Sequence, residues 1–130
     1  MSKARPFIAI VDDEQSVRKA LDRLLRSAGL DVGTFPSGEE FLASLSTHQP
    51  GCVILDLHMP RLTGFDVLAQ MREAGVRVPV IIITGYDTPE SRDRALAAGA
   101  AAYLCKPVND EALLKAITEA LSLEIRADRE

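Results

Sequence analysis

Short and almost wholly apolar runs alternate along this chain with longer segments in which apolar residues recur at helical spacing. The first run, Phe7 to Val11, is apolar at every position, which is typical of a strand covered on both faces in a parallel sheet. The run near Asp31 to Phe35 is less apolar and predicts an edge strand. Three more strands are predicted at 52–55, 78–83 and 102–105.

The intervening segments predict five helices. After the first strand, apolar residues at positions 17, 21, 24, 25 and 28 share one helical face, and Gly29 is expected to end that helix. The other helices are expected after Ser37 and over residues 64–73, 88–98 and 110–123. The fourth helix has few large apolar residues, with Ala95, Leu96 and Ala98 as its expected anchors.

Five strand–helix units in succession predict an α/β fold. Crossover helices of this length imply parallel strands, right-handed connections and helices on both faces of the sheet. The 130 residues suit one domain, residues 1–130, with a core of about 7–123 and a polar tail of 124–130.

Composition narrows the class of protein. The net charge of −4 gives no basic footprint for direct nucleic-acid binding. No apolar run approaches the roughly 18 residues of a membrane span, and no secretory leader is evident. Cys52 and Cys105 are expected to be buried, reduced thiols. These features predict a cytoplasmic protein that does not contact a membrane.

Polar residues end four of the five predicted strands. Asp12 and Asp13 follow the first strand and Asp56 ends the third, while Thr84 ends the fourth and Lys106 follows the fifth. In open α/β sheets, ligands bind beyond the carboxyl ends of the strands. We therefore expect these five side chains to converge on one rim.

This set suits magnesium-assisted phosphoryl transfer. Close carboxylates repel one another by about 4 kcal/mol per pair at an effective dielectric of 20, and a hard divalent cation relieves this repulsion. A carboxylate beside Mg²⁺ can attack phosphorus, with Lys106 and Thr84 contacting the phosphate. Singly, each residue has an ordinary alternative, such as helix capping by Asp12 or Asp13. Their joint placement favours a site.

The motifs resemble the receiver domain of two-component response regulators, the CheY-like superfamily, over about residues 7–123. They are V-D-D-E at 11–14, L-D-L-H-M-P at 55–60 with Gly64, I-T-G at 83–85 and K-P at 106–107. The resemblance is nearest the FixJ/NarL-type branch. It implies a flavodoxin-like, doubly wound sheet of strand order 2-1-3-4-5.

The resemblance also implies residue roles. Asp56 would be the phosphoacceptor, and Asp13, Asp12, Asp56 and the backbone carbonyl of His58 would bind Mg²⁺ or Mn²⁺. Thr84 and Lys106 would contact the phosphate, and Tyr103 would be the aromatic switch residue. The bond before Pro107 is commonly cis in this family.

The family's function follows as an expectation. A sensor histidine kinase would donate the phosphoryl group, and the face formed by the fourth helix, fifth strand and fifth helix would respond. That face would control an output domain or partner protein, or a phosphorylation-dependent homodimer. Such a domain is not a conventional enzyme, although it catalyses its own phosphotransfer and slow autodephosphorylation.

Two further side chains are expected beside the phosphate. His58 lies two residues after Asp56, and Tyr86 lies two residues after Thr84. Bulk at these positions should slow the entry of water, so we expect a fairly long-lived phosphorylated state.

The alternative is a magnesium-dependent phosphatase-type enzyme on the same fold. Phosphatases with an aspartate nucleophile carry D-x-D-x-[TV] after the first strand, which residues 11–15, V-D-D-E-Q, do not supply. A cobalamin-binding module is also disfavoured, because its D-x-H-x-x-G motif would require glycine where this chain has Arg61.

Overall fold

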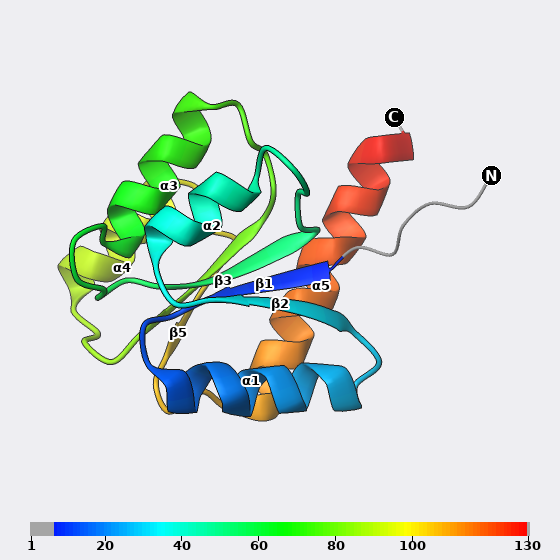
Figure 1. Ribbon diagram of the computed structural model, residues 1–130, viewed down its shortest axis with the longest axis horizontal. Coiled ribbons are helices and arrows are strands. Elements are labelled where there is room, and N and C mark those ends of the chain that lie inside the picture. The colour runs from blue at the N-terminus through cyan, green and yellow to red at the C-terminus, as the bar shows by residue number, and fades with distance from the viewer. Residues whose placement is uncertain (1–6, 130) are drawn as a thin grey trace.

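The computed structural model describes residues 7–129. For residues 123–129 it describes the backbone only. Strands and helices alternate strictly in this part of the chain (Figure 1). The strands are β1 (Phe7–Val11), β2 (Asp31–Phe35), β3 (Cys52–Asp56), β4 (Val80–Thr84) and β5 (Ala102–Cys105). The helices are α1 (Gln15–Ser27), α2 (Gly38–Ser44), α3 (Gly64–Glu73), α4 (Pro89–Ala97) and α5 (Asp110–Arg129).

The five strands form one parallel sheet in the order β2-β1-β3-β4-β5. The predicted fold class and strand order are thus confirmed. Strand order reverses at β1, which pairs with β2 on one side and with β3 on the other. This reversal opens the rim at the carboxyl ends of β1 and β3, where ligands bind in folds of this kind.

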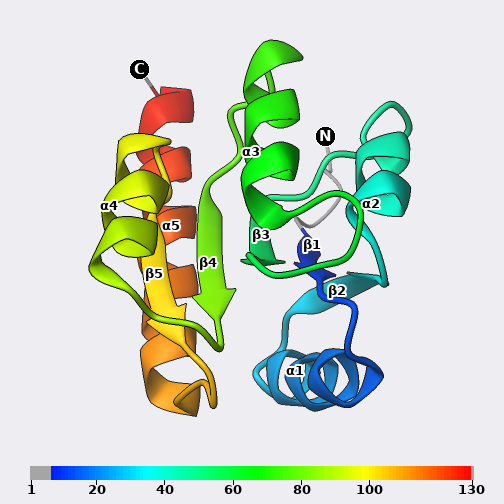
Figure 2. The ribbon, with the colours of Figure 1, turned by 90° about the vertical axis from the view of Figure 1, so that its left-hand side faces the viewer.

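Helices cover both faces of the sheet (Figures 1 and 2). The apolar face of α1 packs with that of α5 on one side, and their buried anchors include Leu25 and Ile117. Helices α2, α3 and α4 pack on the opposite side, with Phe41 and Val67 among the buried residues. The central strands β1, β3 and β4 are buried on both faces, which explains their continuous apolar sequence.

Local sequence accounts for several helix ends. Helix α3 begins with a capping box in which the Thr63 side chain accepts from the backbone N–H of Asp66, and the Asp66 carboxylate accepts from that of Thr63. Gly29 follows α1 at φ +86°, a left-handed conformation that costs glycine little. The predicted end of the first helix is therefore correct.

Three expectations from the sequence were wrong. Helix α5 continues to Arg129 instead of ending at residue 123, since no glycine or proline interrupts residues 124–129. Cys105 is exposed, because it ends an edge strand at the rim, whereas Cys52 is buried. Leu96 does not anchor α4: it is 50% exposed, and Ala95 is the one buried residue of that helix.

No helix among residues 7–129 is both long enough and apolar enough to cross a membrane.

Candidate functional site

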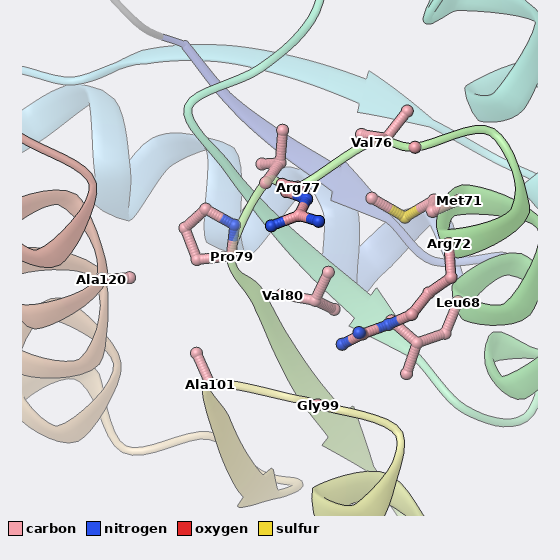
Figure 3. Close-up of a pocket in the computed structure, with 12 residues that line it drawn as sticks. Leu68, Met71, Arg72, Val76, Arg77, Pro79, Val80, Gly99, Ala101 and Ala120 are labelled. Atoms are coloured by element: carbon pink, nitrogen blue, oxygen red, sulfur yellow. The ribbon is translucent and has the colours of Figure 1, made fainter. Parts of the chain in front are cut away.

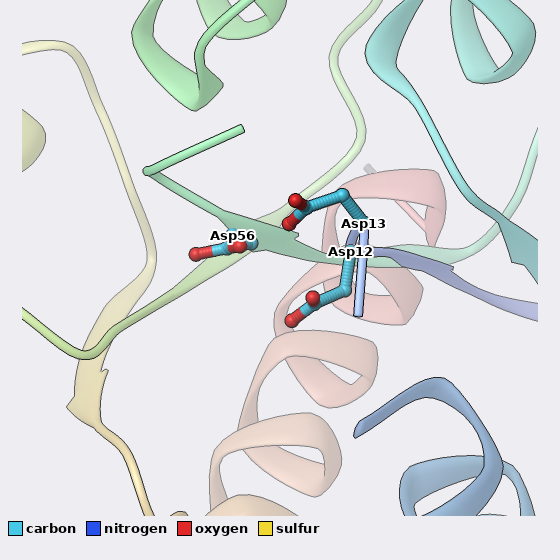
Figure 4. A group of neighbouring side chains, drawn as sticks. All are labelled: Asp12, Asp13 and Asp56. Carbon is cyan, nitrogen blue, oxygen red and sulfur yellow. The ribbon is translucent and has the colours of Figure 1, made fainter. Parts of the chain in front are cut away.

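The strand register brings Asp12 and Asp56 together. Val11 lies opposite Leu55 in the β1–β3 pair, so the next residues of both strands reach the rim side by side. Asp12 is fully buried and Asp56 is 2% exposed, whereas Asp13 is exposed. Figure 4 shows the three carboxylates gathered where the two strands end.

Backbone groups orient two of these carboxylates. The N–H of Glu14 donates to Asp12 Oδ1 at 2.9 Å, and the N–H of His58 donates to Asp56 Oδ1 at 3.2 Å. The Arg18 guanidinium donates to the backbone carbonyl of Asp12 at 2.7 Å, which ties α1 to the end of β1. Each buried carboxylate therefore has one oxygen held by its own loop and the other turned toward the site.

Gly64 allows α3 to begin directly against the end of β3. Its N–H donates to the carbonyl of Leu57 at 2.9 Å. A Cβ at this position would lie 2.5 Å from the Asp56 carbonyl oxygen and 2.8 Å from Leu57 Cα, both of which are backbone atoms that cannot turn aside. The glycine of the sequence motif is thus explained by this close approach.

Lys106 supplies the one cation among the described residues that contacts the carboxylates of Asp12 and Asp56. Its Nζ lies 3.0 Å from Asp12 Oδ2, 3.0 Å from Glu14 Oε1 and 3.5 Å from Asp56 Oδ2. The Lys106–Pro107 peptide bond is cis, and the N–H of Lys106 donates to the carbonyl of Thr84 at 2.8 Å. The side chain crosses from β5 to the ends of β1 and β3.

Burial dominates the electrostatics of the site. Loss of solvation, reinforced by the charge of Asp12, raises the pKa of Asp56 to about 6 despite the opposing effect of Lys106. Burial also raises the pKa of Asp12. For Lys106, burial favours the neutral amine, but contacts with Glu14, Asp12 and Asp56 outweigh it and raise the pKa above its usual value. One ammonium group therefore relieves only part of the carboxylate repulsion.

The unrelieved part of that repulsion fits a divalent cation. One carboxylate oxygen from each of Asp12, Asp13 and Asp56 lies within 4.8 Å of the others. Asp12 Oδ2 is buried, and its close contact among the described residues is the ion pair with the Lys106 ammonium at 3.0 Å. An all-oxygen donor set with one solvent-accessible side suits Mg²⁺, which keeps several waters and accepts phosphate oxygens.

Thr84 and its neighbours form the edge of the site nearest β4. Thr84 is fully buried, and its hydroxyl accepts from the N–H of Tyr86 at 3.0 Å and donates to the Tyr86 carbonyl at 3.3 Å. The hydroxyl is therefore engaged with its own loop. The rings of His58 and Tyr86 meet edge to face, with centroids 5.4 Å apart and an interplanar angle of 74°.

Tyr103 lies away from the acidic cluster, on the face formed by α4 and β5. Its ring is half-buried, and its hydroxyl is buried without a hydrogen-bond partner among the described residues. The Arg92 guanidinium lies over the ring, 5.2 Å from the centroid, and Arg92 Nη2 lies 3.6 Å from Asp87 Oδ2. Tyr103 is thus held by α4 and the loop before it.

The structure brings together Asp12, Asp13, Asp56 and Lys106, as the strand-end pattern predicted. The sequence reasoning missed three contacts: Glu14 with Lys106, Arg18 with the carbonyl of Asp12, and Arg92 with Tyr103. Glu14 directly follows the acidic pair, a signal that could have been used. The partner of Arg92 had no signal in the sequence.

The sheet order and the acidic rim together define a receiver-type domain. The chain belongs to the response-regulator receiver family, since the model of the response regulator receiver domain matches residues 8–118. Members of this family are signalling proteins of two-component systems.

Several individual relatives agree with this assignment. The response regulator protein TodT of Pseudomonas putida is 41% identical over 123 residues, which cover 95% of this chain and 54% of that protein. The transcriptional regulatory protein TdiR of Thauera aromatica is 37% identical over 116 residues, covering 89% of this chain and 51% of that protein. The chain therefore spans about half the length of these curated relatives.

Solved structures show the same fold. The response regulator StyR superposes with a TM-score of 0.88 at 39% identity, covering 97% of this chain and 65% of that one. The chemotaxis protein CheY4 of Vibrio cholerae superposes with a TM-score of 0.83 at 32% identity, covering 91% of this chain and all of that one (100%).

Proposed function

We propose that this chain is a phosphorylation-controlled switch in which Asp56 accepts a phosphoryl group from a sensor histidine kinase. The observation that supports this most strongly is the position of Asp56, which is buried at a strand end between two acidic residues and the ammonium of Lys106. Burying a carboxylate beside other carboxylates costs stability, so its presence there supports a chemical role, such as that of a nucleophile.

The transfer is a displacement at phosphorus. A carboxylate oxygen of Asp56 attacks the phosphohistidine, the P–N bond breaks, and its electron pair stays on the imidazole nitrogen, which takes up a proton. Asp12, Asp13, Asp56 and the backbone carbonyl of His58 would hold Mg²⁺ or Mn²⁺. When bound, the ion neutralises charge on the transferred phosphoryl oxygens. Lys106 offsets charge on the same oxygens from the side of β5.

The acyl phosphate would reorganise the α4-β5-α5 face. The Thr84 hydroxyl, now bonded to the backbone of Tyr86, would turn to the phosphate, and the β4–α4 loop would follow. Helix α4 is weakly anchored, with Ala95 its one buried residue, so a small change can move it. Tyr103 would then shift, since Arg92 of α4 lies over its ring.

His58 and Tyr86 would set the lifetime of the phosphorylated state. Their rings meet edge to face, and we propose that the pair acts as a small aromatic cover over the acyl phosphate. Such a cover limits the approach of the water that hydrolyses the acyl phosphate, which makes autodephosphorylation slow.

The partners follow from the same proposal. The kinase would dock at the rim, and the switched face would control an output domain, a partner protein or a homodimer through α4-β5-α5. Relatives of about twice this length, one of them named as a transcriptional regulator, support a DNA-binding output elsewhere in a longer protein. This domain itself would not bind nucleic acid, and we place the protein in the cytoplasm.

A magnesium-dependent phosphatase is the competing function. It lacks support, because residues 11–15 do not form the D-x-D-x-[TV] motif. Incubation with acetyl phosphate and Mg²⁺ separates the two. The switch predicts modification that stops at one phosphoryl group per chain, and gel filtration with beryllofluoride then reports any dimer. Many turnovers of p-nitrophenyl phosphate would support the enzyme instead.

A further inference from the structure

A cavity of about 610 Å³ lies at the amino ends of the strands, opposite the acidic rim. Figure 3 shows the residues that line it. The cavity opens beside the amino ends of β4 and β5, and Pro79 and Ala101 directly precede these two strands. Asp56 and Thr84 lie at the opposite, carboxyl ends of their strands. Its volume falls in the range of small-molecule sites, about 300–1,000 Å³. Neither the metal nor the phosphoryl chemistry proposed above uses this space.

Small residues keep the cavity open between fixed walls. Gly75 of the α3–β4 loop, Gly99 and Ala101 of the α4–β5 loop and Ala120 of α5 line it. Its backbone is tied to the sheet, because the N–H of Ala101 donates to the carbonyl of Val80 at 2.8 Å and that of Val53 donates to the carbonyl of Pro79 at 3.0 Å. The cavity is therefore part of the folded framework.

The chemistry of the lining is divided between apolar and cationic groups. Leu68, Met71 and Val80 are buried and form an apolar floor. Arg72 and Arg77 are both exposed and line the same space. Figure 3 shows Arg72 extending from α3 toward Gly99 and Arg77 lying beside Pro79.

These two guanidinium groups lack acidic partners. Among residues 7–122, neither forms an ion pair, although Arg26, Arg61 and Arg92 each pair with a carboxylate. Arg72 lies so close to Gly99 that a Cβ there would overlap its guanidinium, and Gly99 has φ +92°, a conformation that favours glycine. The turn before β5 thus makes room for Arg72 at the edge of the cavity.

We propose that this cavity binds a small organic anion, with an apolar body on the floor and one carboxylate between Arg72 and Arg77. Guanidinium groups pair readily with carboxylates, and the apolar floor gains from burying a hydrocarbon chain. Charge complementarity selects an anion, because neither guanidinium forms an ion pair with a carboxylate of residues 7–122. This site is independent of Asp56 phosphorylation and does not require it.

Octanoate titration of the ¹⁵N-labelled protein, followed by amide chemical shifts, tests the proposal without any activity assay. Saturable shifts at Val76, Ala101 and Ala120 with a Kd of about 1 mM or tighter are expected for a ligand of this size. Acetate, which lacks the apolar body, and octan-1-ol, which lacks the charge, should each bind at least about tenfold more weakly, a difference of roughly 1.4 kcal/mol.

Matched variants locate the binding. Arg72→Gln and Arg77→Gln should each weaken octanoate about tenfold, and Ala101→Leu should fill the cavity and abolish saturation. Arg23→Gln, which makes the same charge change on α1, should leave the Kd unchanged. Absence of saturable shifts in the folded wild type, or equal weakening by Arg23→Gln and the cavity variants, would overturn the proposal. Because phosphorylation plays no part in the titration, failure here would leave the assignment of Asp56 untouched.

Discussion

Lys106 Nζ lies 3.5 Å from Asp56 Oδ2, although Lys106 follows β5 and Asp56 ends β3, and β4 lies between these two strands. The lysine reaches across that strand and also contacts Asp12 and Glu14. One cation thus faces three carboxylates, two of them buried. Burial, reinforced by the charge of Asp12, raises the pKa of Asp56. The excess of carboxylates over cations accounts for the fit of a divalent cation.

Asp56→Asn should stabilise the metal-free protein at neutral pH. The pKa of Asp56 is raised to about 6 from an ordinary 3.8, so the native state holds this proton more tightly than the unfolded chain does. Its contribution to the free energy of unfolding therefore falls as pH rises from about 4 to 6, by about 2–3 kcal/mol at most. Asparagine carries no titrating carboxyl group, so the variant does not lose stability in this way as the pH rises.

Urea unfolding in EDTA, followed by circular dichroism from pH 4 to 7, measures the effect. The stability of Asp56→Asn minus that of the wild type should be near zero at pH 4 and reach about 1–2 kcal/mol at pH 7. A difference that does not grow with pH would contradict the electrostatic account. Asp93→Asn, on the exposed side of α4, serves as the control.

Magnesium should stabilise the protein through Asp12 and Asp13. A ligand that binds only the native state raises Tm with its concentration. Asp13→Asn removes an exposed carboxylate of the cluster and should weaken Mg²⁺ at least about tenfold, because one of few charged ligands is lost. Thermal unfolding across a MgCl₂ series should show a much smaller rise in Tm than in the wild type or in Asp93→Asn. Equal rises in Tm for all three proteins would mean that Mg²⁺ does not bind at Asp13.

Gly64→Ala should damage both stability and site. The added Cβ would meet the backbone of Asp56 and Leu57 at 2.5 and 2.8 Å, and neither atom can move without shifting the end of β3. We expect a loss of about 1–3 kcal/mol in the free energy of unfolding, together with weaker Mg²⁺ binding. Gly85→Ala is the matched comparison, since its Cβ would meet nothing within 4 Å. If both variants lose the same free energy of unfolding, the close approach of Gly64 to β3 does not contribute to stability.

His58→Gly and Tyr86→Gly should each speed the loss of phosphate severalfold. Both rings belong to one edge-to-face pair at the rim, so removing either one opens the cover to water. The measurement is the decay of phosphorylated protein after the phosphodonor is removed, followed by ³¹P NMR. His48→Gly changes a histidine whose ring meets that of Phe7 edge to face, and it should leave the decay unchanged. Wild-type lifetimes in the His58 and Tyr86 variants would refute the shielding role.

The strands and the acidic site could be predicted from sequence because both follow from short-range pattern. Asp12, Asp56 and Thr84 each stand where an apolar run stops. Because the strands are parallel, their carboxyl ends share one edge of the sheet, so these residues reach the rim however the helices pack. Partners distant along the chain are harder to predict. The place of Glu14 beside the acidic pair was a signal for its contact with Lys106, but no local pattern pairs Arg92 with Tyr103.

Other features depended on the tertiary arrangement. The exposure of Cys105 follows from its place at the end of an edge strand, and that of Leu96 from which side of α4 meets the sheet. The cavity at Arg72 arises where α3, the loop after it, the α4–β5 loop and α5 meet around small residues. None of these is a property of a local stretch of sequence.

The site of phosphorylation tests the central claim most directly. Wild-type protein and Asp56→Asn are incubated with acetyl phosphate and Mg²⁺, and their intact masses are compared by mass spectrometry. We expect the wild type to gain the mass of one phosphoryl group, and this gain to be absent in Asp56→Asn and in wild type with EDTA. A wild type that gains no mass, or an Asp56→Asn variant that gains as much as the wild type, would contradict the assignment of Asp56 as the phosphoryl acceptor.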